Sequence, residues 1–460
     1  MPSVEGLGAR RAALQMLDAV LRRGRTLDAA GGAIRNLSPP DHALAVAIAG
    51  EALRRLPDLD GLIDSATRQR LPDDSKARMV LRLALAQKIG LGTPEHALVA
   101  TALPLVDGGP RRLVHGVLGT LLRRGLPAVD SPRLPADVEE RWGSAWGEAS
   151  VLAARRQIAR RPPLDLTFAD HGEAQAYANA NQGRSLAANH VRLQSASVTA
   201  LPGFGEGRWW VQDLSASLPA RLIPAGASDV LDLCAAPGGK TMQLAAAGHA
   251  VTAVDASASR LGRLQENLQR THLDAKLVEA DALKWKPDRQ FDAILLDAPC
   301  SATGTFRRHP EVLYRARPRL IAESADVQGE LLGRAASWLK PGGVLVYSVC
   351  SLEPQEGEQI IDQFLASRDD FLLDELKVSP LVGEVGGGPA ASAADETHLL
   401  ALSADADNAP PPNPPHKGEE SDLPEFAPVS PEGWVRILPG LLEAEGGLDG
   451  FFIARLVRAG

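Results

Sequence analysis

Apolar residues recur every three or four positions through residues 7–125, as they do on the buried faces of amphipathic helices. The segments Ala77–Leu91, Pro94–Leu105 and Arg111–Arg124 follow this spacing, and Ser38-Pro39-Pro40-Asp41 is typical of a helix start. We therefore expect residues 1–125 to form an all-helical domain. Arginine pairs such as Arg22-Arg23 lie near the expected helix ends. They fit either an ordinary solvated surface or a patch that faces RNA.

The pattern changes after residue 125. Residues 126–160 are expected to form a linker that includes a helix with Trp142 and Trp146. Beyond Pro162-Pro163, Leu164–Phe168 alternates like a strand, Glu173–Ala180 has helical spacing, and Val191–Leu201 again alternates like a strand. Residues 161–210 are therefore predicted to form a small α+β subdomain.

Short apolar strands alternate with helical segments over residues 211–460, which predicts a doubly wound α/β domain with a mostly parallel sheet. The last expected strand, Gly450–Val457, is antiparallel to the others and closes the sheet. The segment at about 384–424 is rich in Pro, Ala and acidic residues, and we expect a disordered insert there. The five expected parallel strands are Val230–Leu233, Ala250–Val254, Ala275–Val278, Ala293–Leu296 and Val344–Val349.

Composition limits the class of protein. Hydrophobic residues make up 45% of the chain and charged residues 23%, as in globular proteins, and no apolar run is long enough to span a membrane. The N-terminus lacks the features of a secretory signal, and there are only three cysteines, so we expect a cytoplasmic protein without a disulfide framework. No spacing of Cys and His is typical of a zinc site, so no metal is expected. We also expect a monomer.

The net charge of −8 at first argues against a nucleic-acid partner. However, eight acidic residues and one lysine lie between Glu384 and Asp422, and this segment carries −7 of the total. The remainder of the chain is almost neutral and contains clusters of arginine. The acidic balance therefore belongs to the insert, and it does not exclude RNA.

A glycine-containing loop follows the first expected parallel strand and precedes a helix. Such a loop lets a ligand approach the backbone and the free N–H groups of the helix. Gly239, Lys240 and Thr241 match the end of a phosphate-binding P-loop, but Cys234 stands where that motif requires glycine. Asp255 and Asp281 follow the next two strands, where acids bind the ribose and adenine of a nucleoside, although either could be a helix cap. An adenosyl cofactor is therefore favoured over a nucleoside triphosphate.

Cys300 and Cys350 each follow the carboxyl end of an expected strand, where open parallel sheets bind ligands. A single cysteine is usually a small buried hydrophobe. Two at equivalent strand ends suggest chemistry on cytosine, because a thiolate that adds to C6 of the base makes C5 nucleophilic. A second acid/base group is then needed to remove the C5 proton, while Lys240 and Asp297 could hold the base. The base must be single-stranded or flipped out of a duplex.

Three long motifs resemble those of the RNA 5-methylcytosine methyltransferases of the Sun/NOL1/NOP2 family. They are Asp232–Thr241, Asp297–Gly304 with Arg307 to Pro310, and Tyr347–Leu352 with Glu356 and Glu358. Within this family the chain looks like the bacterial branch that methylates 16S ribosomal RNA. That branch has a Rossmann-like methyltransferase domain, a NusB-like N-terminal domain and a small RNA-binding subdomain.

The resemblance implies an enzyme that uses S-adenosyl-L-methionine and acts on ribosomal RNA. Cys350 corresponds to the nucleophile, and Cys300 to the cysteine that assists release of the enzyme–RNA adduct. Asp255 would bind the ribose, Asp281 would lie near the adenine, and Asp297 would lie between cofactor and cytosine. Arg307 and Arg308 are candidates for phosphate contacts. The cofactor would be wrapped by Cys234, Ala235, Ala236, Pro237, Gly238, Gly239 and Lys240.

The sequence departs from the family pattern in two short stretches. Val114-His-Gly-Val-Leu118 differs from the usual form of that motif, and Val312-Leu313-Tyr314 stands where a tryptophan-containing stretch is expected. Two other functions stay open at this point: a catalytically idle RNA-binding or ribosome assembly factor on the same fold, and a P-loop nucleotide-binding protein. Methyl transfer to unmodified ribosomal RNA would separate the first from an enzyme, and titration with S-adenosylmethionine against ATP would exclude the second.

Overall fold

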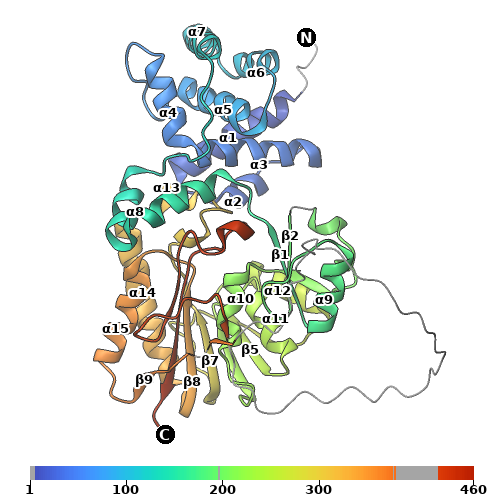
Figure 1. Ribbon diagram of the computed structural model, residues 1–460, viewed down its shortest axis with the longest axis vertical. Helices are drawn as coiled ribbons and strands as arrows, with labels where there is room; N and C mark the ends of the chain where they lie inside the picture. The colour runs from blue at the N-terminus through green and yellow to red at the C-terminus, as the bar shows by residue number, and fades with distance from the viewer. Residues whose placement is uncertain (1–5, 195–196, 377, 380–422) are drawn as a thin grey trace, which may run out of the picture.

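The computed structural model describes residues 6–194, 197–376, 378–379 and 423–460. The expected acidic insert at about 384–424 lies outside these residues, except for Leu423 and Pro424. Figure 1 shows a helical domain above an α/β domain, with α8 and α13 between them. No helix in the described part of the chain is long and apolar enough to cross a membrane.

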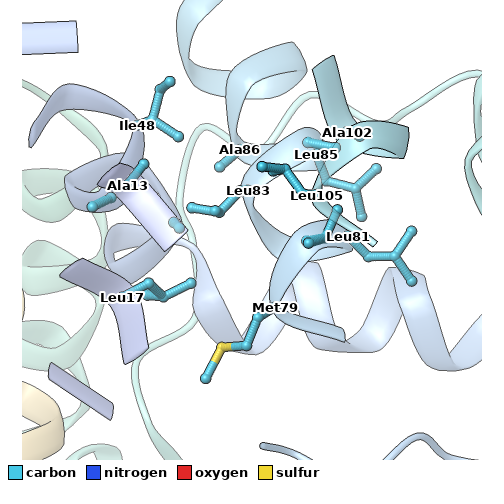
Figure 2. Close-up of a cluster of buried hydrophobic side chains, with 14 of the residues drawn as sticks. Ala13, Leu17, Ile48, Met79, Leu81, Leu83, Leu85, Ala86, Ala102 and Leu105 are labelled. Carbon is cyan, nitrogen blue, oxygen red and sulfur yellow. The ribbon is translucent and has the colours of Figure 1, made fainter. Parts of the chain in front are cut away.

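The N-terminal domain is all helical, as predicted. Helix α5 is central, and α1, α3, α4, α6 and α7 pack around it, so nearly every side chain of its first three turns is buried. Leu17, Ile48 and Leu81 meet in this core and are fully buried (Figure 2). The helices are α1 (Leu7–Arg23), α2 (Leu27–Gly32), α3 (Pro39–Arg54), α4 (Leu56–Ser65), α5 (Lys76–Leu91), α6 (Glu95–Ala102) and α7 (Gly108–Arg124), with a 3-10 turn at Leu103–Leu105.

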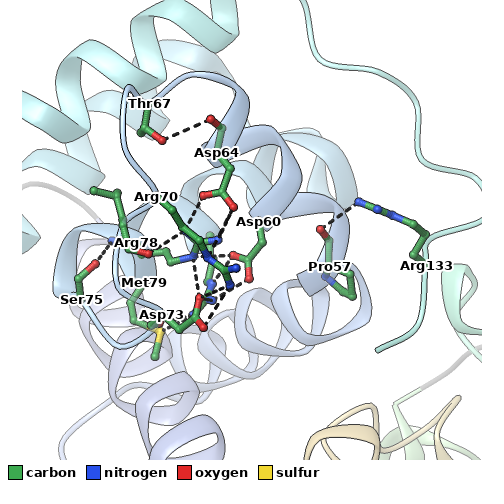
Figure 3. A network of polar contacts seen from close by, with 12 residues as sticks. Pro57, Asp60, Asp64, Thr67, Arg70, Asp73, Ser75, Arg78, Met79 and Arg133 are labelled. Atoms are coloured by element: carbon green, nitrogen blue, oxygen red, sulfur yellow. Dashed lines mark hydrogen bonds and ion pairs between the residues drawn. The ribbon is translucent and has the colours of Figure 1, made fainter. Parts of the chain in front are cut away.

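Two arginines of α5 point into this domain instead of toward solvent. Nη1 of Arg78 donates to Asp64 over 2.7 Å, and Nε of Arg82 donates to Asp60 over 2.7 Å (Figure 3). Arg78 is 0% exposed, and a buried guanidinium is tolerated only when carboxylates neutralise it. The network ties the α4–α5 connection to α5, so these two arginines stabilise the domain and do not face a nucleic acid.

Helix α8 (Ala136–Ala159), which bends at Gly147, leads into the small subdomain. Its sheet has the order β2-β1-β3, with β1 (Leu164–Phe168), β2 (His190–Leu193) and β3 (Trp209–Val211), and α9 (His171–Ala180) covers it. The strand expected over Val191–Leu201 ends early, at Leu193. Leu193 pairs with Leu164, the first residue of β1, and Pro163 before it cannot extend the ladder. Val198–Ala200 forms a 3-10 turn instead.

The large sheet has the order β12-β13-β8-β7-β4-β5-β6. All five expected parallel strands are present, and β13 (Phe451–Arg458) is antiparallel to β8 as predicted. The prediction that this last strand closes the sheet is wrong, because β12 (Val435–Ile437) pairs on its outer side. The other strands of this sheet are β4 (Asp229–Leu233), β5 (Ala250–Asp255), β6 (Lys276–Glu279), β7 (Phe291–Asp297) and β8 (Leu339–Val349), and the short β9 (Phe371–Leu373) pairs with β13. A separate two-stranded sheet is formed by β10 (Val378–Ser379) and β11 (Leu423–Pro424).

Helices cover both faces of this sheet. Helices α10 (Leu214–Arg221), α11 (Gly239–Ala246) and α12 (Ala258–Thr271) pack on one face, and α14 (Pro318–Ser337) and α15 (Glu358–Ala366) pack on the other (Figure 1). This doubly wound arrangement brings the carboxyl ends of β4, β5, β7 and β8 to one edge.

Short helix α13 (Val312–Arg315) joins the α/β domain to the helical domain. The Tyr314 hydroxyl donates to the Leu53 carbonyl over 2.7 Å, and the Leu27 amide donates to Glu311 over 3.0 Å. The stretch that departs from the family pattern at Val312-Leu313-Tyr314 therefore lies at a domain contact. The other stretch that differs from the family pattern lies on α7, where Val114 and Leu118 are in the core and His115 is at the surface.

Candidate active site

Cys300 and Cys350 lie together at the edge where β7 and β8 end. The two strands are parallel neighbours, and Asp297 pairs with Ser348, so the turns that follow them start side by side. Both cysteines are half-buried, and their sulfur atoms are 3.5 Å apart. The contact with Cys350, together with burial, raises the pKa of the Cys300 thiol well above its usual value. The structure therefore brings together the two cysteines that the sequence singled out.

One buried carboxylate connects the two cysteine turns. Glu356 accepts hydrogen bonds from the amide and hydroxyl of Ser301, the residue after Cys300, and from the hydroxyl of Ser351, the residue after Cys350. Gln328 donates to the same carboxylate over 3.2 Å. Glu356 is 0% exposed, and burial raises its pKa. This brace fixes the positions of both thiols.

Lys240 and Asp297 form an ion pair beside the cysteines. Nζ of Lys240 donates to Oδ2 of Asp297 over 2.7 Å, and the Ser348 hydroxyl donates to Oδ1 over 3.0 Å. Lys240 is nearly buried, whereas about a third of the Asp297 side chain is exposed. Asp297 thus comes from the strand that carries Cys300, and Lys240 comes from the start of α11. The pair lies where the cofactor loop meets the cysteine turns.

The cofactor loop bends sharply over the end of β4. Cys234 has a φ of 58°, the Ala236–Pro237 peptide is cis, and Gly238 has a φ of 105°. A Cβ at Gly238 would stand 2.0 Å from Cδ1 of Leu264, so only glycine fits there. Helix α11 begins at Gly239 and directs free amide groups to this edge. Ala235, which follows Cys234, is also buried in the loop.

Two carboxylates support this loop from below. The Thr241 hydroxyl donates to Asp232 over 2.6 Å, and complete burial raises the pKa of Asp232 to about 7. Asp255 accepts hydrogen bonds from the Ala236 and Ser257 amides, over 3.2 and 2.9 Å, and is paired with Arg260. Asp255 therefore lies at the expected strand end and fixes the loop, and its contact with a ribose stays a prediction.

The residues at this edge fit an adenosyl ligand. Three features of this edge are those that nucleoside-binding sheets use. They are a backbone that only glycine can follow, the amino end of a helix, and acidic residues after β5 and β6. Asp281 follows β6, is well exposed, and accepts a hydrogen bond from the Leu283 amide over 3.0 Å. Its place near an adenine stays a prediction. Burial raises the pKa of the third thiol, that of Cys234, to about 12, and its sulfur contacts neither of the other two.

Arg307 and Arg308 have different surroundings. Arg307 is 1% exposed and lies between the carboxylates of Asp213 and Asp449, so its guanidinium is committed to the protein interior and is not available to a phosphate. Arg308 shares Asp449 but keeps 36% of its side chain exposed. Of the two expected phosphate contacts, only Arg308 is placed to make one.

Sequence reasoning gave no role to Glu356, although a signal was present. Each of the two cysteines is followed by serine, as Cys300-Ser301 and Cys350-Ser351, and both serines donate to Glu356. A repeated Cys-Ser pair at two strand ends is the pattern that points to a shared acceptor. Asp449, which binds both arginines from 141 or 142 residues away, has no comparable local signal.

Comparison with known proteins gives consistent matches. The 16S rRNA methyltransferase RsmB/F family matches residues 220–457, and the NusB family matches residues 7–123. Ribosomal RNA small subunit methyltransferase B of Erwinia tasmaniensis is 34% identical over 400 residues, which cover 79% of this chain and 91% of that protein. The protein of the same name from Xanthomonas campestris pv. campestris is 37% identical over 390 residues, covering 79% and 89%.

Solved structures agree on the fold. The crystal structure of PH0851 aligns with 99% of each chain at a TM-score of 0.67 and 21% identity. A methyltransferase homolog from Pyrococcus horikoshii covers 74% of this chain and 98% of its own, with a TM-score of 0.51 and 26% identity.

The sheet order, the cofactor loop and the helices on both faces define an S-adenosylmethionine-dependent methyltransferase with a NusB-type domain at its N-terminus. S-adenosyl-L-methionine is its cofactor and RNA its class of substrate. The chain belongs to the RsmB/F family of 16S rRNA methyltransferases.

Proposed function

We propose that this protein methylates C5 of a cytosine in small-subunit 16S ribosomal RNA through a covalent bond between Cys350 and C6 of the base. The observation that carries the proposal is the 3.5 Å separation of the Cys300 and Cys350 sulfur atoms at the edge of the sheet where the glycine-containing loop lies. An enzyme that methylates an exocyclic nitrogen or a ribose hydroxyl needs no nucleophile of its own. Two adjacent thiols therefore favour chemistry on a carbon of the base.

Cys350 acts as the nucleophile in this proposal. Its thiolate forms the S–C6 bond, and the electron pair of the C5–C6 double bond becomes available at C5. The bound S-adenosylmethionine supplies an electrophilic methyl group and leaves as its thioether. The C5 proton must then depart, so that its bonding electrons restore the double bond and expel the Cys350 thiolate.

Cys300 serves this last step. It lies within contact distance of Cys350, and the raised pKa of its thiol keeps it protonated. The neutral thiol can donate its proton to the Cys350 sulfur as the S–C6 bond breaks, and the thiolate that this leaves accepts the C5 proton. Lys240 and Asp297, joined by a 2.7 Å ion pair, offer a cation and a carboxylate to the polar edge of the base.

Methyl-transfer assays on unmodified 16S ribosomal RNA test this proposal. Cys350→Ala removes the nucleophile and is expected to abolish transfer, while Cys300→Ala is expected to trap a covalent protein–RNA adduct that survives denaturing gel electrophoresis. Cys234→Ala is the matched control, because the Cys234 sulfur makes no contact with the sulfur of Cys300 or Cys350, so its removal should trap no adduct. Full activity of Cys350→Ala, or absence of an adduct with Cys300→Ala, would overturn the mechanism. Bisulfite sequencing of the product identifies the methylated cytosine.

A further inference from the structure

A polar cavity of about 510 Å³ lies between helix α8, the small subdomain and the loop before β13. Its walls come from Arg156, Gln157 and residues 160–163, from Gln182, Arg184 and residues 192–194, and from residues 443–446, together with Arg307. The volume falls in the range of ligand sites, roughly 300–1,000 Å³. None of the residues assigned to the cofactor or to the two cysteines lines it.

Most of the arginines around the cavity are already neutralised. Arg156 makes a two-pronged ion pair with Glu443 at 2.7 and 2.8 Å, and Arg192 does the same with Asp165 at 2.7 Å on each side. Arg184 is paired with Glu445. These pairs hold the segments around the cavity together, and they leave little positive charge for a ligand.

Arg160 and Arg161 are different. Both are exposed and both line the cavity, and the guanidinium of neither makes a hydrogen bond or an ion pair with any residue that the structure describes. The charge of Arg160 lowers the pKa of Glu443, which is already paired with Arg156. The donors of two adjacent guanidinium groups are therefore available to a phosphate, because each offers several N–H groups in a planar fork.

Gln157 provides a second, independent observation. It lines the same cavity and is 6% exposed, yet both atoms of its amide lack a hydrogen-bond partner within the described residues. A buried amide without partners is costly, and the side chain offers a donor and an acceptor together. A Cβ on Gly447 would stand 2.6 Å from its Nε2, so the glycine leaves room for this amide. The edge of a nucleobase carries the complementary acceptor and donor.

The cavity also adjoins the catalytic turn. Arg307 lies seven positions after Cys300 and donates to the carbonyl of Gly446, a wall residue, over 3.0 Å. The Gly450 amide in turn donates to the Gly304 carbonyl over 2.9 Å. A chain of direct contacts therefore links the cavity wall to the turn that carries Cys300.

We propose that this cavity binds one nucleotide of the RNA strand beside the target cytosine, with its phosphate on Arg160 and Arg161 and its base on Gln157. This inference rests on the proposed function, since it assumes an RNA substrate. The cavity would then set which stretch of single strand reaches the cysteines.

The first test is filter binding of an unmodified 16S ribosomal RNA transcript at several salt concentrations. Arg160→Gln combined with Arg161→Gln is expected to weaken binding about 10-fold and to reduce the slope of log affinity against log salt by about 0.7, the value for one lost phosphate contact on single-stranded RNA. The control, Arg289→Gln with Lys340→Gln, makes the same charge change at the amino ends of β7 and β8, the opposite edge of the sheet. The slope should not change in the control. Equal slopes for both double variants would overturn the inference.

The second test separates ligand binding from structure at Gln157. Gln157→Met keeps the size of the side chain and removes the unpartnered amide, so the melting temperature of the free protein should stay the same or rise, while RNA affinity falls about 5-fold. A lower melting temperature with unchanged RNA affinity would show a structural role and overturn the base contact. Both tests measure binding, so they remain decisive if the methylated atom proves not to be C5.

Discussion

The sulfur of Cys300 lies 3.5 Å from the sulfur of Cys350, although 50 positions separate the two residues in the chain. The pairing of Asp297 with Ser348 explains this, because Cys300 lies three residues after Asp297 and Cys350 lies two residues after Ser348. Two parallel neighbouring strands thus deliver both thiols to one point. The distance allows one thiol to act on a group that is bonded to the other.

The adjacent thiols predict a reversible loss of activity on oxidation. A mild thiol oxidant such as diamide should join Cys300 to Cys350 and stop methyl transfer, and dithiothreitol should restore it. Cys234 should stay outside this bond, because its sulfur contacts neither of the other two sulfur atoms. Peptide mass mapping identifies the linked pair. A disulfide that includes Cys234, or full activity after complete oxidation, would contradict the assigned geometry.

Glu356 is predicted to act as a positioning residue. Glu356→Gln replaces a carboxylate that accepts from Ser301 and Ser351 with an amide that can accept on one side only. We expect kcat to fall by about 10- to 100-fold, the cost of a small displacement of reacting groups, with little change in the Kd for S-adenosylmethionine.

The matched control for Glu356 is Glu353→Gln. Glu353 is equally buried but accepts from Arg141 and Trp142 on α8, so its loss should lower stability without a comparable fall in kcat. Initial rates and thermal melts of both variants decide the question. An equal fall in kcat for the two variants would remove the positioning role.

Asp232 predicts a pH dependence of stability. Burial raises its pKa from 3.8 to about 7, so the folded protein binds a proton between these values that the unfolded chain does not. The free energy of unfolding should therefore decrease as the pH rises from about 4 to 7, by on the order of 4 kcal/mol from this group. Asp232→Asn cannot ionise and should lose less stability between pH 5 and pH 8. Urea unfolding of both proteins measures the difference, and parallel losses would show that Asp232 is ionised throughout.

Substitution by glutamine should lower stability mainly at Arg307 and RNA binding mainly at Arg308. Arg307→Gln leaves Asp213 and Asp449 buried with less compensation and should cost about 3–5 kcal/mol of stability. Arg308→Gln removes a partly exposed side chain, so a smaller loss of stability and weaker RNA binding are expected. Urea unfolding and filter binding of the two variants test this. A larger loss of RNA binding with Arg307→Gln than with Arg308→Gln would assign the phosphate contact to Arg307 instead.

Local pattern was sufficient for the types of the main elements and for the positions of the two cysteines at strand ends. Period-two and period-3.6 spacing identified the five parallel strands and the helical domain, because each depends on neighbours within one element. The strand predicted over Val191–Leu201 was too long. It ends at Leu193, because its partner strand β1 begins at Leu164, and nothing close in the sequence shows this. Gly450–Val457 was placed last in the sheet, because no local signal shows that Val435–Ile437 pairs outside it.

The sequence by itself determined which residues stand at the strand ends, and hence the cysteine pair, the cofactor loop and Asp297. Only the tertiary structure decided how their neighbours are used. Arg307 forms an ion pair with Asp449, which lies 142 positions away in the chain. Gln157, Arg161 and Glu443 come from distant segments and line the same cavity. Spacing along a chain records contacts within a few residues. Burial and charge pairing between distant segments depend on how complete domains pack, so they could be read only from the folded protein.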